Sequence, residues 1–267
     1  MVIEERHRAA TDVADAPGST NEASEARWAV PLIVGHRAPA QGDGGGDARE
    51  VRLLLDGDSV TADLPAAAWP SFVANFGAHG FYRTRYAPEL LDALLADLGQ
   101  MTPLERYTLV DDAWASVLAG TTAAADFLAM VEGFAHEDDL SVWERIVGAL
   151  SVLDRIVDDD ARVLLSGRIG ALIDPARRRL GDDVRPDDDD DRTAALRGML
   201  LNTAAVLAYD LEAQARCRAL LDRFIHDPAS VEASLSAPAL TAAATLGDVA
   251  LHERLVATFE AAANPQD

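Results

Sequence analysis

The chain has 267 residues, of which 49% are hydrophobic and 6% aromatic, which is enough for a sizeable core and for two modest domains. Its formal net charge is −22 and its 23 basic residues are all arginine, so nucleic acids and anionic membranes are disfavoured as partners. A single cysteine, Cys217, excludes a disulfide framework, and the absence of a signal-peptide layout and of long apolar runs predicts a cytoplasmic protein.

The first third of the sequence has the pattern of a small β domain that follows a flexible lead-in. Residues 1–26 are polar and rich in Ala, Ser, Glu and Asp. Short apolar runs follow, separated by Gly and Pro, and the glycine-rich stretch 41–47 is expected to be a hairpin loop. The runs predicted as strands are 28–34, 51–55, 59–64, 69–76 and 81–86. Together they indicate an antiparallel β-sandwich-like domain over residues 27–86.

After Pro88 the apolar period changes from two to 3.6 residues, which predicts helices up to the C-terminus. Thr102-Pro103-Leu104-Glu105 is a capping box with proline at the first helical position. The buried face of that helix is predicted to contain Tyr107, Val110, Ala113, Trp114, Val117 and Leu118. Later helices are predicted at about 122–135, 141–157, 160–180, 189–207, 210–226, 237–246 and 248–262.

Short loops between these helices favour antiparallel helix pairs stacked into an αα superhelical, HEAT-like array over residues 87–267. The predicted fold class is therefore mainly α, with a small N-terminal antiparallel β-sandwich. Four X-Pro steps are expected to mark helix boundaries, at Pro175, Pro186, Pro228 and Pro238. The acidic run Asp187–Asp191 lacks calcium-loop spacing and is expected to be an exposed loop or a first helical turn.

No catalytic motif is complete in this sequence. The zinc-helix pattern needs two histidines four residues apart around a glutamate, but His136-Glu137 leads to Leu140 and His252-Glu253 leads to Val256. There is no nucleophile elbow, P-loop or dinucleotide fingerprint, and Cys217 is expected to be a buried structural thiol. The residues by themselves therefore predict a chain that is not an enzyme, with no cofactor and no metal.

Four landmarks in chain order carry a family resemblance. Asn75 followed by Gly80-Phe81-Tyr82-Arg83 and Tyr86 resembles the Asn and Gly-Tyr-Tyr-Arg-Val-x-Tyr pattern of zinc aminopeptidases of the aminopeptidase N family. Residues 28–32 are similar to the family's W-x-V-P-L strand, residues 104–114 to its R-x-x-L-x-D-D-A-F helix, and residues 134–143 to its L-x-x-E-x-x-x-x-x-W pattern. The resemblance covers residues 27–165 and extends more loosely over the later helices.

The resemblance implies the C-terminal region of such an enzyme, without the zinc-binding catalytic domain and with a helical domain that is truncated relative to the family. In the family this region caps the catalytic domain, walls off the peptide chamber and limits substrate size. The implied partners are the catalytic domain of the parent aminopeptidase or another protein, and peptides. Zinc belongs to the parent enzymes and not to this chain.

The residues of the resemblance also have a structural interpretation. Tyr82 and Tyr86 share one face of the predicted strand and are expected to pack the β domain against the first helices. Arg83 or Arg106 is expected to pair with Asp111 or Asp112 and so to hold the β domain on the helices. Contact with a peptide is the alternative role for these residues, and the resemblance points to Arg155 as a further peptide-facing candidate.

Two functions from different classes remain open at this point. The first is a non-catalytic scaffold or cap of an aminopeptidase N-type enzyme. The second is a free-standing helical-repeat module that binds a partner protein. A third possibility, an enzyme in its own right, has no supporting residues in the sequence.

Overall fold

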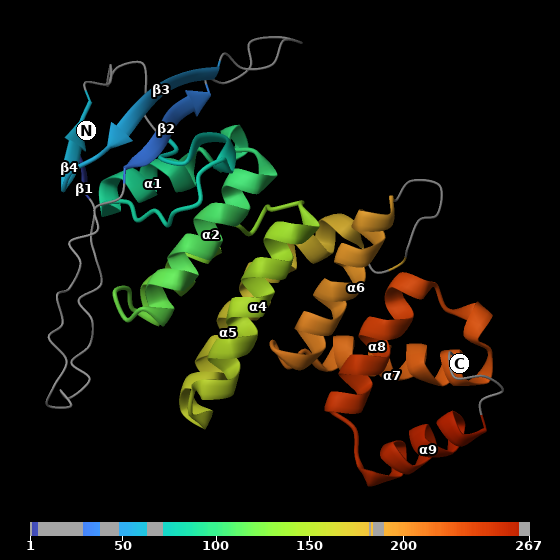
Figure 1. The fold of residues 1–267 in the computed structure, drawn as a ribbon. Coiled ribbons are helices and arrows are strands. Elements are labelled where there is room, and N and C mark those ends of the chain that lie inside the picture. Colours follow the sequence, from blue (N-terminus) through green and yellow to red (C-terminus); the bar gives the residue numbers. More distant parts are fainter. Residues whose placement is uncertain are drawn as a thin grey trace, which may run out of the picture. The chain divides into compact units, whose positions relative to one another are not determined.

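The structure is a computed structural model that describes residues 2–4, 29–37, 48–62, 72–181, 183 and 190–261. The chain divides into two compact units, Met1–Asp112 and Ala113–Asp267. The described residues are mostly helical, with short antiparallel strands confined to the N-terminal unit, which confirms the mainly α fold class (Figure 1). The domain bounds predicted from the sequence, at 26/27 and 86/87, remain predictions.

The strands form two separate two-stranded antiparallel sheets. In one sheet β2 (Val30–Arg37) pairs with β3 (Ala48–Leu55), with Val30 opposite Leu55 and Arg37 opposite Ala48. In the other sheet β1 (Val2–Glu4) pairs with β4 (Ser59–Thr61). The predicted strands at 28–34, 51–55 and 59–64 are therefore confirmed over their described parts, whereas the predicted loop 41–47 lies outside the described residues.

Two predicted strands are wrong. Residues 81–86 belong to no sheet and bend at Phe81 and Tyr82. In the stretch 69–76 the described part makes only an isolated bridge between Val73 and Gly35 before a 3-10 turn at Phe76–Ala78. The reason lies in the hydrogen bonds. The backbone N–H of Thr84 donates to the Asp112 carboxylate at 2.9 Å, so a side chain occupies the donor that a neighbouring strand would use.

The helices agree with the predicted segments to within a few residues. The N-terminal unit contains α1 (Pro88–Ala96), a 3-10 turn (Leu98–Gln100) and most of α2 (Pro103–Leu118). The C-terminal unit contains α3 (Ala124–Glu132), α4 (Leu140–Ile156), α5 (Asp159–Leu180), α6 (Asp191–Val206), α7 (Leu211–His226), a 3-10 turn (Pro228–Ser230), α8 (Ala233–Thr245) and α9 (Val249–Glu260).

Aspartate residues start most helices of the C-terminal unit. The side chains of Asp139, Asp158, Asp190, Asp210 and Asp248 accept hydrogen bonds from backbone N–H groups in the first turns of α4, α5, α6, α7 and α9. Aspartate at this position satisfies donors that have no partner within the helix and suits the positive end of the helix dipole. Part of the acidic excess of the chain therefore has a local structural use, and the end of the 187–191 run is the start of a helix, as predicted.

Two of the prolines do not end helices, contrary to the prediction. Pro175 lies inside α5 and Pro238 lies inside α8, whereas Pro228 does mark the end of α7 and Pro186 lies outside the described residues. Each proline costs its helix one backbone hydrogen bond, because it has no N–H. At Pro238, Asn202 Nδ2 in α6 donates to the Pro238 carbonyl at 3.0 Å and so connects this part of α8 to the neighbouring helix.

Each unit has a buried apolar core. The fully buried side chains of the C-terminal unit include Trp143, Phe127, Phe134, Ile146, Ile169, Ile173 and Leu200, and those of the N-terminal unit include Val34 and Leu94. On α2 the predicted buried face is correct for Val110 and Trp114, but Leu118 is 66% exposed. No helix in the described part of the chain is long and apolar enough to cross a membrane.

Helices α6 and α8 approach each other closely at Gly198. A Cβ atom at this position would lie 2.1 Å from the Ser234 carbonyl oxygen and 3.0 Å from Pro238 Cγ. Pro238 lacks the N–H that would otherwise bond this carbonyl in the helix, and the carbonyl oxygen lies against Gly198 of α6. Only a residue without a side chain fits here.

We therefore expect Gly198→Ala to lower the free energy of unfolding by about 1–3 kcal/mol, because α6 and α8 must move apart. The matched control is Gly148→Ala in α4, where an added Cβ meets nothing within 4 Å. That change should be neutral or stabilising by up to about 1 kcal/mol, since alanine is the better helix former. Urea denaturation followed by circular dichroism measures both. Equal effects of the two substitutions would contradict the close-packing interpretation.

Candidate functional site

The family-like residues lie in an irregular segment, residues 72–87, which we call the junction segment. It connects the strands to α1 and contacts α2 within the N-terminal unit. A turn opens it, in which Gly77 and Ala78 have φ values of 74° and 55°. The buried Asn75 side chain fixes this turn, because Asn75 Nδ2 donates to the Gly80 carbonyl at 3.0 Å and Asn75 Oδ1 accepts from the Gly80 N–H at 2.8 Å. The asparagine of the motif is thus a backbone clamp.

The two tyrosines of the motif hold the peptide groups of Ala74. The Ala74 N–H donates to the Tyr86 hydroxyl at 2.9 Å, and the Tyr82 hydroxyl donates to the Ala74 carbonyl at 3.1 Å. Burial raises the pKa of Tyr86 to about 12, against the opposing effect of its hydrogen bonds with Ala74 and Thr84. Burial also raises the pKa of Tyr82, opposed by a backbone hydrogen bond from Ile33 in β2. Both hydroxyls are therefore neutral structural groups at pH 7.

The Asp112 carboxylate is the centre of the contacts between the junction segment and α2. Asp112 is 2% exposed and accepts from the Thr84 N–H at 2.9 Å, the Thr84 hydroxyl at 2.6 Å and Arg83 Nη1 at 3.0 Å. Arg83 also pairs with Asp111, and its hydrogen bonds to Asp111 and then Asp112 raise the pKa of its guanidinium. The predicted ion pair between an arginine of the motif and this acidic pair is present in the structure.

A second buried carboxylate of α2, Glu105, holds the opening turn of the same segment. Glu105 Oε1 accepts from the Gly77 N–H at 2.7 Å, and Oε2 accepts from the Thr102 N–H at 2.8 Å and from the Thr102 hydroxyl at 3.0 Å. The Arg37 guanidinium also pairs with Glu105 and lies 4.2 Å above the centre of the Phe76 ring. The capping box was visible in the sequence, but nothing in the spacing indicated that its glutamate also binds Gly77 and Arg37.

The other two candidate residues, Arg106 and Arg155, make different contacts from those of the junction segment. Arg106 donates to the Met101 carbonyl at 2.8 Å at the start of α2. Arg155 belongs to the C-terminal unit, where its Nε donates to the Ser151 carbonyl at 3.1 Å on the exposed side of α4. The structure therefore brings Tyr82, Arg83, Tyr86, Asp111 and Asp112 together around the junction segment. Peptide contact by any of the seven candidates remains a prediction.

The fourth family landmark is also structural. The Trp143 indole, which is fully buried, donates to the Glu137 carbonyl at 3.0 Å. The Glu137 carboxylate accepts from the N–H groups of Asp138 and Asp139, each at 2.9 Å, and Arg179 Nη2 donates to the Glu137 carbonyl at 2.7 Å. The glutamate and tryptophan of this pattern thus shape the loop that leads into α4.

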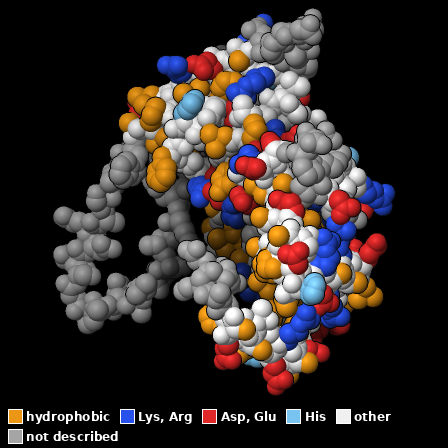
Figure 2. Space-filling view, turned by 90° about the vertical axis from the view of Figure 1, so that its right-hand side faces the viewer, with side chains coloured by type: hydrophobic (Ala, Val, Ile, Leu, Met, Phe, Trp, Pro, Cys, Tyr) orange, Lys and Arg blue, Asp and Glu red, His pale blue; other side chains and the backbone are white. Residues whose placement is uncertain are grey.

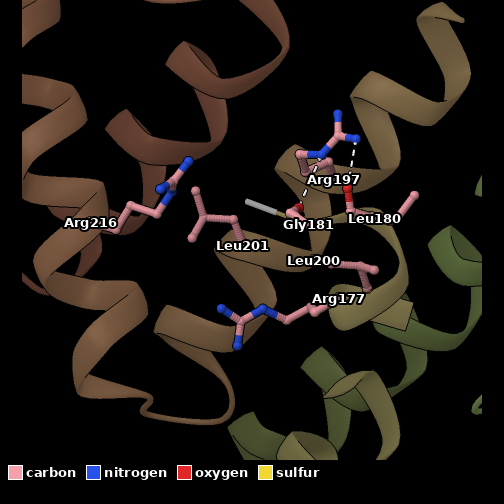
Figure 3. Close-up of a pocket in the computed structure, with 7 residues that line it drawn as sticks. All are labelled: Arg177, Leu180, Gly181, Arg197, Leu200, Leu201 and Arg216. Carbon is pink, nitrogen blue, oxygen red and sulfur yellow. Dashed lines mark hydrogen bonds between the residues drawn. The ribbon is translucent and has the colours of Figure 1, made fainter. Parts of the chain in front are cut away.

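A cavity in the C-terminal unit is bordered by three arginines but is not built to bind a ligand. It lies between the end of α5, α6 and α7, has a volume of about 10 Å³, and is lined by Arg177, Leu180, Gly181, Arg197, Leu200, Leu201 and Arg216. Figure 3 shows the three guanidinium groups pointing in different directions. Arg197 donates to the Gly181 and Leu180 carbonyls at 3.1 and 3.0 Å and so caps the end of α5. Such a volume holds about one water molecule.

Several other arginines are paired with carboxylates. Examples are Arg168 with Glu132 at 2.7 Å and Arg192 with Asp139 at 3.1 Å, and Figure 2 shows acidic and basic side chains next to one another on the visible face. Within the described ranges no group of three or more His, Cys, Asp or Glu residues is placed to hold a metal ion. Burial raises the pKa of the Cys217 thiol to about 11, which agrees with the predicted structural thiol.

Comparison with known proteins gives a consistent family. Residues 71–267 match the model of the ERAP1-like C-terminal domain. The chain is 25% identical over 189 residues to Tricorn protease-interacting factor F2 of Thermoplasma acidophilum, a match that covers 68% of this chain and 21% of that protein. It is 32% identical over 130 residues to puromycin-sensitive aminopeptidase of Caenorhabditis elegans, covering 48% of this chain and 13% of that enzyme.

A third relative, alanine/arginine aminopeptidase of Saccharomyces cerevisiae, is 31% identical over 101 residues, which is 38% of this chain and 12% of the enzyme. The chain therefore spans about a fifth or less of the length of these relatives.

The first prediction from this geometry compares the two adjacent aspartates of α2. We expect Asp112→Ala to lower the free energy of unfolding by about 2–4 kcal/mol, because three donors lose a buried acceptor. Asp111→Ala is the matched control and should cost less than about 1 kcal/mol, since it removes one ion pair of an exposed arginine. Chemical denaturation of both variants measures the difference. A smaller loss for Asp112→Ala than for Asp111→Ala would contradict the central role of Asp112.

The second prediction concerns high pH. The pKa of Tyr86 is raised from 10.0 to about 12, so the neutral phenol stabilises the folded state fully below pH 10.0, and this contribution is lost as the pH rises to about 12. Tyr86→Phe cannot titrate. The stability difference between the parent and this variant should therefore shrink by about 1.4 kcal/mol per pH unit in that window. Denaturation curves at several pH values test this, and parallel curves would show that Tyr86 ionises normally.

Proposed function

This chain belongs to the ERAP1-like C-terminal domain family, the C-terminal domain of aminopeptidases of the aminopeptidase N family, and from that membership we propose that it is a non-catalytic cap of such an enzyme. In this proposal the helical unit forms a HEAT-like wall of the peptide chamber and limits the access of substrates. The observation that carries the proposal is the match over residues 71–267, together with the buried contacts that hold the junction segment on α2.

The geometry supports a scaffold role for the family landmarks. Asn75, Tyr82, Tyr86, Asp112 and Glu105 use their polar atoms on backbone groups of this chain or on neighbouring side chains. Groups that are engaged in this way position a segment and are not free to attack, protonate or bind a substrate. We assign them the task of fixing the junction segment before the helices.

The proposed partners follow from the same reasoning. They are the catalytic domain of an aminopeptidase, which would supply the zinc site, and peptides at the helical wall. The net charge of −22 disfavours nucleic acid, and we propose a cytoplasmic location.

The alternative function is a free-standing helical-repeat module that binds a partner protein. It is favoured by exposed apolar side chains where α4 ends and α5 begins. Ile156, Val163 and Leu164 are 72%, 71% and 72% exposed.

A chimera tests the cap. In it, the C-terminal region of the C. elegans puromycin-sensitive aminopeptidase that matches this chain is replaced by the corresponding residues of this chain. An aminoacyl-aminomethylcoumarin, which is small enough to need no access control, reports whether the chimera is folded and active. The cap predicts that the chimera hydrolyses this reagent as well as the parent enzyme does but cleaves long peptides at least tenfold more slowly than an enzyme from which the region is deleted, because the wall restricts entry.

Two further measurements complete the test. The purified chain alone should hydrolyse no aminoacyl-aminomethylcoumarin and retain no zinc after dialysis. Hydrolysis by the chain alone, or equal cleavage of long peptides by the chimera and the deleted enzyme, would reject the proposed cap. The second result would leave the binding module as the better function.

A further inference from the structure

The sheet formed by β2 and β3 has two outer edges, and they differ. The outer edge of β2 is covered: the Gly35 N–H and carbonyl bond the carbonyl and N–H of Val73 at 3.0 and 2.8 Å, and the Ile33 backbone bonds the Tyr82 hydroxyl. Pro31 on the same edge has no N–H to offer. The junction segment thus closes this side of the sheet.

Among the described residues, no strand pairs with the outer edge of β3. The N–H and carbonyl of Gly35 point away from β3, toward Val73. In an antiparallel pair, opposite residues point these groups either both inward or both outward, so the N–H and carbonyl of Glu50, opposite Gly35, point away from β2. The same alternation applies to Ala48, Arg52 and Leu54, and no ladder continues from this edge among the described residues. In Figure 1, β3 lies on the side of β2 that faces away from α1. An eight-residue edge of this kind is a template for another strand.

The side chains along this edge select an antiparallel copy of themselves. Glu50 and Arg52 lie on one face, with side chains 42% and 77% exposed, and they pair with each other at 2.9 Å. If a second β3 runs antiparallel with Val51 opposite Val51, then Glu50 of each copy lies opposite Arg52 of the other. Shifting the register by two residues places Glu50 opposite Glu50 or Arg52 opposite Arg52, which is unfavourable.

Backbone geometry and burial fit the same register. The opposed pairs 50–52 and 48–54 join residues whose N–H and carbonyl groups both point outward, which gives about eight new backbone hydrogen bonds in total. Val51 and Leu53, which are only half-buried in one copy, would be covered by the neighbouring strand, and Leu54, which is 53% exposed, would lie beside Ala48. A two-stranded sheet is marginal, and a four-stranded sheet is much more stable.

From these observations we infer that β3 is a self-association edge, at which two copies of this chain form a symmetric dimer through a continuous four-stranded sheet centred on Val51. The interface is the same patch on both copies, as a twofold axis requires. The inference does not depend on the proposed cap function, since it concerns only residues 30–37, 48–55 and 73–82.

Charge exchange at two positions tests the dimer. Sedimentation velocity over a range of protein concentrations at about 0.15 M salt, where long-range repulsion between the acidic chains is screened, gives the dissociation constant. Glu50→Arg places arginines opposite each other and Arg52→Glu places glutamates opposite each other. Each single variant should weaken the dimer at least about tenfold. A one-to-one mixture of the two variants restores both cross-strand ion pairs and should form a heterodimer as tight as the parent dimer.

The controls make equal charge changes away from the edge. Glu144→Arg on α4 and Arg218→Glu on α7 alter exposed residues of the C-terminal unit and should leave the dissociation constant unchanged. Amide hydrogen exchange gives an independent reading. The amides of Glu50, Arg52 and Leu54 should become protected as the concentration rises, whereas those of Val51 and Leu53 are already bonded to β2.

Several results would overturn the inference. They are a parent chain that stays monomeric at all concentrations, single variants that associate as tightly as the parent, and edge amides whose exchange is independent of concentration. Association that only the control variants disturb would place the contact elsewhere. A strand supplied by another part of an aminopeptidase would appear as a monomeric parent chain and would equally reject a second copy as the occupant.

Discussion

Buried carboxylates need donors, and the N-terminal unit is arranged to supply them to Asp112. This side chain leaves almost no surface to water, and its acceptor sites are filled by Thr84 and Arg83. Burying a carboxylate without such partners lowers the free energy of unfolding by about 1–3 kcal/mol for each unsatisfied group, and by more where the group is charged. The junction segment must therefore run where its N–H and hydroxyl groups reach α2. That path in turn sets the positions of Tyr82 and Tyr86 and hence the closure of β2.

Glu105 is a second buried carboxylate that needs donors, and it receives one of them from the opening turn of the junction segment. It stands two turns before Asp112 on the same helix and holds Gly77, Thr102 and Arg37 at once. Helix α2 thus presents two carboxylates to a segment that has no regular secondary structure of its own. The carboxylates of α2 need donors, and the backbone of the junction segment needs acceptors. In this chain these hydrogen bonds account for the order of an aromatic and basic segment followed by an acidic helix, and they involve no catalytic step.

The sequence predicted the helices well because their signals are local. Apolar periodicity and the capping box at Thr102 are both readable within a few residues. The predictions failed where the local structure depends on contacts with residues far away in the sequence. Residues 81–86 alternate as a strand does, but their backbone donors are taken by a side chain 28 residues away in the case of Thr84 and Asp112. Pro175 and Pro238 were predicted as boundaries from the local X-Pro signal, but α5 and α8 continue through them, and at Pro238 the contact with Asn202 comes from another helix.

The candidate site shows the same division. An ion pair between Arg83 or Arg106 and Asp111 or Asp112 was predicted because the motif residues and the acidic pair stand out in the sequence, and Arg83 is the arginine that pairs with both aspartates. The sequence analysis missed three sets of contacts: the hydrogen bonds between Asn75 and Gly80, those of the two tyrosine hydroxyls with Ala74, and the bond from Gly77 to Glu105. Short-range spacing does not reveal which backbone group a side chain will contact. A pattern of this kind identifies a family more readily than it identifies a function.

The unequal edges of the β2–β3 sheet have a consequence for growth. A sheet that is open on both sides can add strands without limit, which is the geometry of fibres. Here Val73 bonds Gly35, the Tyr82 hydroxyl lies at the Ile33 backbone, and Pro31 has no N–H, so the junction segment occupies the β2 side in the described part of the chain. In the proposed dimer the sheet would therefore stop at the two β2 strands, because β3 is the edge that receives the partner.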